Sequence, residues 1–113
     1  MYRLWIFLCF VAALLAQGPK STATGNAENG KRLFEKFGCY TCHGHQGQGG
    51  AGARIAPRPI ALAALIAYVR HPSGSMPPFT AKVVTDSELT DIHAFLASVP
   101  APPAVKDIPL LNQ

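Results

Sequence analysis

The stretch that decides the fold runs from residue 39 to residue 50 and reads CYTCHGHQGQGG. It places two cysteines and a histidine within five residues, as C-x-x-C-H, and four glycines follow. In this spacing the two thiols can add to the two vinyl groups of one haem, and the adjacent histidine can ligate the iron. The stretch therefore predicts one haem c, attached covalently through Cys39 and Cys42, with His43 as an axial iron ligand.

Other uses of these residues fit the sequence less well. A zinc site would need a second pair of ligands, but no cysteine follows Cys42 and the other histidines lack zinc-finger spacing. A thioredoxin-like redox motif would need a βαβ setting, which the sequence does not offer. The glycines are not accompanied by the lysine of a phosphate-binding loop. A disulfide across so short a loop would add little stability.

The first 23 residues are typical of an export signal. Arg3 gives a basic start, and residues 4–16 form an uncharged apolar run of thirteen residues. This run is shorter than the roughly 20 residues that span a membrane but suits a signal peptide. We expect a signal peptide over residues 1–23, cleaved after Ala23, and hence a periplasmic protein with no stable membrane insertion. Cleavage after Ala16 and an uncleaved N-terminal anchor are the alternatives.

Charge and size limit the function further. The full chain has a formal net charge of +4, but without residues 1–23 it keeps 8 basic and 6 acidic residues, a net charge of +2. No basic cluster larger than Lys31-Arg32 remains, so a nucleic-acid partner is not expected. A domain of about 90 residues has a small core and often needs a cofactor to be robust.

The rest of the chain predicts an all-α domain over residues 24–99, with three main helices. Apolar stripes and caps place these helices at 26–37, 60–70 and 85–99. Asn26 is the expected N-cap of the first helix, and Thr85 with Glu88 forms a capping box at the start of the last. Gly30 lies on the apolar stripe of the first helix, where a partner could cross closely.

The segments between and after these helices are expected to be irregular. Residues 43–59 and 71–82 are rich in glycine and proline, which disfavours regular elements. The tail over residues 100–113 has four prolines and is expected to run over the surface in extended form. Its apolar end could instead contact a partner protein. Arg58, Tyr68 and Arg70 could bond haem propionates or be ordinary surface residues.

The second axial ligand must come from elsewhere in the chain. Met76 is the only methionine after residue 1, and it lies between glycine and prolines, a poor place for filling a core. His45 is too close to His43 to reach the opposite side of the haem, and His71 and His93 are expected at the surface. We therefore predict Met76 as the second ligand, although an iron without a second protein ligand remains an alternative.

At this point the sequence resembles class I c-type cytochromes over residues 26–99. The similarity rests on Gly30 and Phe34, on the C-x-x-C-H stretch, on Pro57, and on the segments 76–79 (MPPF) and 88–96 (ELTDIHAFL). It implies a small cytochrome c fold around one covalently bound haem, with Met76 on the iron. It further implies that the first and last helices cross near Gly30 and Phe95, and that the Pro57 carbonyl accepts a hydrogen bond from the ligand histidine.

The resemblance implies one-electron transfer, because two protein ligands close the iron to substrates. The tail is similar to that of cytochrome subunits of periplasmic dehydrogenases. We expect a soluble carrier or the electron-accepting subunit of a dehydrogenase, and not an enzyme by itself. The partners would be a dehydrogenase donor, and an oxidase or cytochrome acceptor. The alternative is a five-coordinate c-type haem protein that binds a gas or reduces peroxide.

Overall fold

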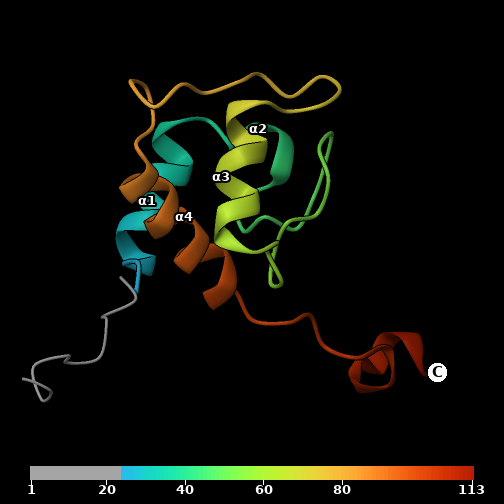
Figure 1. Ribbon diagram of the computed structural model, residues 1–113. Coiled ribbons are helices and arrows are strands. Elements are labelled where there is room, and N and C mark those ends of the chain that lie inside the picture. Colours follow the sequence, from blue (N-terminus) through green and yellow to red (C-terminus); the bar gives the residue numbers. More distant parts are fainter. Residues whose placement is uncertain (1–23) are drawn as a thin grey trace, which may run out of the picture.

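The computed structural model describes residues 24–113, and this part of the chain is helical without any strand, which confirms the all-α prediction (Figure 1). The predicted signal peptide lies outside the described residues. Within residues 24–113, none of the helices has the length and apolar character needed to cross a membrane. The elements in chain order are α1 (Ala27–Lys36), α2 (Tyr40–His43), α3 (Leu62–Arg70), α4 (Asp86–Ser98) and the short 3-10 helices η1 (Val105–Asp107) and η2 (Pro109–Leu111).

The helix ends follow from side chains that the sequence identified. The Asn26 side chain caps α1 by accepting a hydrogen bond from the Asn29 amide at 2.9 Å. The Thr85 hydroxyl accepts from the Glu88 amide, and the Glu88 carboxylate accepts from the Thr85 amide at 2.8 Å. Both caps satisfy backbone donors that a helix start would otherwise leave unpaired. The predicted helices therefore begin and end within two residues of those observed.

Helices α1 and α4 cross in direct backbone contact at Gly30. A Cβ atom on Gly30 would lie only 1.9 Å from the Asp91 carbonyl oxygen, which no side chain can occupy. Next to this crossing, the Phe34 and Phe95 rings pack at 5.6 Å between centroids, and both side chains are buried. The crossing that the resemblance implied is therefore present. Glycine is required here by the close approach of two backbones.

Asp91 ties the start of α1 to α4 on the outer side of this crossing. Its carboxylate accepts hydrogen bonds from the Asn26 amide and from the Asn29 side-chain amide, both at 2.7 Å. These bonds hold the pKa of Asp91 below its ordinary value, and the bond from the Asn29 side chain contributes more than that from the Asn26 amide. These bonds therefore favour the folded state when the carboxyl group is ionised.

This arrangement predicts an acid-dependent loss of stability. Because the folded-state pKa is depressed, the contribution of Asp91 is fully present above the unfolded-state pKa of about 3.9. It is lost as the pH falls through the lower folded-state pKa. In urea unfolding at neutral pH, Asp91→Asn should lower stability by about 1 kcal/mol, discounted for solvent exposure. The difference in the free energy of unfolding between wild type and Asp91→Asn should shrink as the pH falls below 4. A constant difference down to pH 2 would contradict this role of Asp91.

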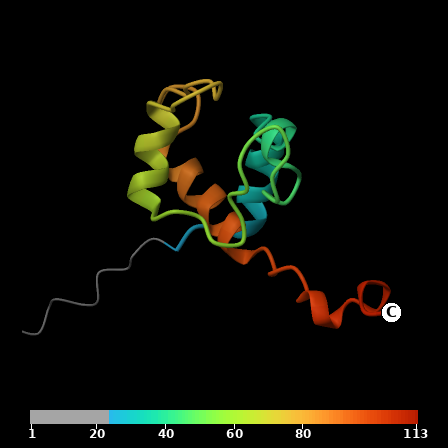
Figure 2. The same ribbon diagram turned by 90° about the vertical axis from the view of Figure 1, so that its right-hand side faces the viewer.

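Helix α3 lies on one side of α4, and α1 with α2 lies on the other (Figure 2). The buried side chain of Leu65 on α3 joins the core formed by Leu33, Phe34, Leu89, Ile92 and Leu96. The segment between α2 and α3 crosses from one side to the other. The two sides thus face each other across an apolar interior that α4 closes from below.

The C-terminal tail differs from its prediction. It leaves the body of the protein after α4 and does not run over the surface (Figure 1). Its end folds into η1 and η2, where the Asn112 side-chain amide donates to the carbonyls of Val105 and Ile108 at 2.9 Å. The prolines make the first part extended, as expected, but these local bonds give the end a turn structure of its own. Val105, Leu110 and Leu111 are left 66%, 80% and 62% exposed.

Candidate haem site

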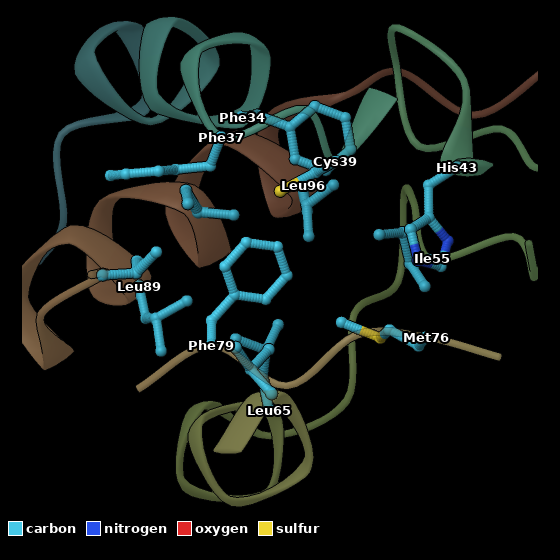
Figure 3. Close-up of a pocket in the computed structure, with 13 residues that line it drawn as sticks. Phe34, Phe37, Cys39, His43, Ile55, Leu65, Met76, Phe79, Leu89 and Leu96 are labelled. Atoms are coloured by element: carbon cyan, nitrogen blue, oxygen red, sulfur yellow. The ribbon is translucent and has the colours of Figure 1, made fainter. Parts of the chain in front are cut away.

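An apolar pocket opens between the two sides of the fold, and Cys39, His43 and Met76 all line it (Figure 3). Cys39 and His43 reach it from the α2 side, while Met76 reaches it from the loop between α3 and α4. The other lining residues are all apolar: Phe34, Phe37, Ile55, Leu65, Val69, Phe79, Val84, Leu89, Ile92 and Leu96. The pocket thus combines apolar walls with sulfur and nitrogen donors on facing sides.

The C-x-x-C-H stretch is itself a single helical turn, which the sequence reasoning did not predict. The His43 amide donates to the Cys39 carbonyl at 3.0 Å, so these two residues lie one turn apart on the same face. Both therefore line the pocket, while Cys42 is exposed and is not among the residues that line it. Both thiols are unpaired, and burial raises the pKa of Cys39 above its ordinary value. The Cys39 thiol is thus free at the pocket, whereas the Cys42 thiol is free but exposed outside its lining.

The glycine-rich loop supports His43 from behind. The His43 Nδ1 donates to the Ala53 carbonyl at 2.7 Å, because a carbonyl can only accept. In the neutral imidazole this bond places the proton on Nδ1, so Nε2 is the nitrogen that could ligate a metal. A Cβ atom on Gly52 would lie 3.1 Å from the imidazole ring, so the loop backbone packs closely against the ring. The loop thereby fixes both the tautomer and the orientation of His43.

The hydrogen-bond acceptor of His43 is not the predicted Pro57 carbonyl. The carbonyl that accepts from His43 belongs to Ala53, four residues earlier than Pro57. The amides of Ile55 and Ala56 bond the Gly47 carbonyl at 2.8 and 3.0 Å, which fixes the loop just before Pro57. Pro57 instead lines a surface groove beside the start of the tail. Several loop carbonyls could reach His43, and the spacing of prolines could not distinguish them.

None of the other histidines lines the pocket. The exposed His45 ring stacks on Tyr40 with 4.5 Å between centroids. His93 uses Nε2 in a contact of 3.0 Å with the Ile60 carbonyl and so links α4 to the segment before α3. His71 is exposed. Over residues 24–113, no group of three or more His, Cys, Asp or Glu side chains lies close enough together to hold a metal ion.

Two of the residues considered for haem propionates have other partners. The Tyr68 hydroxyl lies 2.9 Å from the Ser73 hydroxyl, and the Arg70 guanidinium bonds Phe79 and Asp86. These contacts hold the loop that carries Met76. The sequence offered no signal for them, since each partner lies in an irregular segment or at a helix end.

The fold and this pocket define a small haem-binding domain of the c-type cytochrome class. Residues 25–96 match the model of the family described as "Cytochrome C oxidase, cbb3-type, subunit III". This match covers more than half of the chain, and the chain therefore belongs to this family of c-type cytochromes, whose members carry covalent haem and take part in electron transfer.

A curated relative gives a more particular likeness. The chain is 33% identical over 91 residues to the 4-cresol dehydrogenase [hydroxylating] cytochrome c subunit of Pseudomonas putida. The alignment covers 80% of this chain and 78% of that subunit. No solved structure matches the chain.

Proposed function

We propose that this protein transfers single electrons through one haem c that is bound covalently at Cys39 and Cys42 and ligated by His43 and Met76. The observation that carries the proposal is that an imidazole, a thiol and a thioether line one apolar pocket, with His43 and Met76 on facing elements. Thiols, an unprotonated imidazole nitrogen and a thioether are the donor set that haem c requires. A haem held by these residues would supply an iron that can take up and give up a single electron.

The residues of the chain have separate roles in this proposal. The bond from His43 Nδ1 to the Ala53 carbonyl keeps the ring oriented and strengthens Nε2 as a ligand. The apolar walls keep water away and disfavour additional positive charge, which raises the reduction potential. Met76 favours the ferrous state, since a thioether binds ferrous iron better than ferric iron. Two protein ligands also leave no position on the iron for a substrate.

Covalent attachment is tested by replacing both cysteines of the motif. The variant Cys39→Ala/Cys42→Ala should show no haem that survives a denaturing gel. Wild type should show a haem-stained band clearly below the 12.0 kDa of the full chain, because residues 1–23 are expected to be removed. Cys9→Ala is the matched control and should stain like wild type, because residue 9 lies outside the domain. A haem-stained band of full intensity in the double variant would disprove the attachment.

Axial ligation by Met76 is tested on the reduced protein. With both positions held by the protein, carbon monoxide should bind the ferrous form only slowly and weakly. Rapid and complete binding to wild type would instead identify a five-coordinate haem and a gas-binding or peroxide-reducing function. The measurement is the absorption change after carbon monoxide is added to protein that was exported with its haem.

We further propose that the protein is exported to the periplasm and serves a dehydrogenase, either as a free carrier or as a bound subunit. The export signal expected over residues 1–23 and the relative's description as a dehydrogenase subunit support this proposal. The exposed apolar side chains of Val105, Leu110 and Leu111 support a role of the tail in holding the dehydrogenase. A protein that lacks residues 100–113 but still co-purifies fully with its dehydrogenase would contradict this role.

A further inference from the structure

The loop that carries Met76 has no helix or strand of its own. It connects the end of α3 at Arg70 with the start of α4 at Asp86 and includes residues 71–85. Most of its residues are exposed, including both prolines that follow Met76. A ligand on such a loop competes with water and with other ligands, because an irregular exposed segment opens easily. Something in the chain must therefore hold the loop against the pocket.

The holding contacts converge on Phe79, three residues after Met76. The Phe79 amide donates to the Val69 carbonyl at 3.0 Å. The Phe79 carbonyl accepts from Arg70 Nη1 at 2.9 Å. The Phe79 ring lies in the pocket beside Met76 and Leu65 (Figure 3). Both backbone groups of Phe79 are thus bonded to the last turn of α3, and its side chain anchors the loop from inside.

Arg70 also connects the loop to the third helix of the site. Its Nη2 donates to Asp86 Oδ1 at 2.5 Å, so one guanidinium joins the end of α3, the loop and the first residue of α4. The Arg70 side chain is 15% exposed, whereas that of Asp86 is 67% exposed. The ion pair with an exposed carboxylate is worth little, and the shielded bond to the carbonyl is worth more. A guanidinium is suited to this role because its planar donors point to two acceptors at once.

We propose that Arg70 is a positioning residue for Met76, which it keeps on the iron by fixing the carbonyl of Phe79. This inference rests on the proposed ligation by Met76. Arg70 touches neither ligand. It acts by lowering the fraction of molecules in which the loop is open and the iron can take another ligand.

The test measures the binding of imidazole to the ferric, haem-loaded protein. Imidazole competes with Met76 for the iron, so its apparent affinity reports the fraction of open loops. Arg70→Met removes both donors and keeps a long apolar stem. It should tighten imidazole binding about tenfold, the effect of losing one hydrogen bond to a charged group. As the pH is raised, the far-red absorption band of methionine-ligated ferric haem should also weaken at a lower pH in Arg70→Met than in wild type.

Two controls separate this role from a merely structural one. Asp86→Asn removes the charge of the ion pair but leaves the bond from Arg70 to Phe79, and should change imidazole affinity less than about threefold. Asp91→Asn weakens the fold at the crossing of α1 and α4, away from the loop, and should leave imidazole affinity unchanged. Arg70→Lys keeps the positive charge but lacks the planar pair of guanidinium donors. Its imidazole affinity should fall between those of wild type and Arg70→Met.

The outcomes distinguish this inference from the proposed ligation. A wild-type protein without the far-red band would overturn both. A wild type with the band, together with Arg70→Met that binds imidazole as wild type does, would overturn the role of Arg70 alone. An effect of Asp86→Asn as large as that of Arg70→Met would overturn the assignment to the Phe79 carbonyl. If Arg70→Met does not fold, Arg70→Lys must show the tighter binding for the inference to stand.

Discussion

Gly30→Ala is expected to cost about 3 kcal/mol of folding free energy or more, at the upper end of the range for overpacking. The added methyl group would lie 1.9 Å from the Asp91 carbonyl oxygen, so α1 and α4 would have to move apart. That movement would also separate Phe34 from Phe95. In a domain of this size such a loss is a large part of the total stability. Urea unfolding of the haem-loaded protein, followed by far-UV circular dichroism, measures it.

Lys31→Ala is the matched control for this prediction. Residue 31 is the next position on α1, and its side chain is exposed. Alanine is a good helix former, so this variant should lie within about 0.5 kcal/mol of wild type. If Gly30→Ala were as stable as Lys31→Ala, the two backbones would not be in contact at this crossing.

Met76→Ala is expected to change the iron site without unfolding the protein. Met76 is only partly buried and lies in a loop, so its loss leaves the core intact. The far-red band of the ferric protein should disappear, and the ferrous protein should bind carbon monoxide readily. The reduction potential should fall by at least about 60 mV, which corresponds to a tenfold weaker preference for the ferrous state. Absorption spectra and a redox titration measure these changes.

Val83→Ala serves as the control in the same loop. Val83 is 56% exposed and does not line the pocket, so its replacement should leave spectrum and potential unchanged. A far-red band that persisted in Met76→Ala would show that sulfur from Met76 is not on the iron. The carrier function would then lose its main support.

The elements that were predictable from the sequence are those set by local chemistry. Asn26 and the pair of Thr85 and Glu88 cap their helices through bonds that span three residues, and the apolar stripes repeat with the helical period. Gly30 was informative because a glycine lowers the stability of a helix, so its presence on the apolar stripe indicates a closely packed neighbour. Three of the four predicted haem-binding side chains, Cys39, His43 and Met76, line one pocket, whereas Cys42 does not line it.

The features that the sequence did not predict depend on how irregular segments fold in space. The Ala53 carbonyl meets His43 across ten residues of an irregular loop, and nothing in the local sequence indicates which carbonyl does so. The partners of Arg70 lie 9 and 16 residues away, in a loop and at a helix start. The tail forms turns through Asn112, a contact that its proline content did not indicate.

The bonds between α1 and α4 have a consequence for the order of events during synthesis. Asn26 and Asn29 meet Asp91 across 65 and 62 positions of the chain, so α1 cannot pair with α4 until nearly the whole domain has been made. Such distant pairing delays folding, because a long loop must close before any contact rewards it. During this interval the segment around Cys39 and Cys42 is not yet covered by α4. The late pairing of α1 with α4 thus provides a period in which the proposed attachment at these thiols would meet an incompletely packed domain.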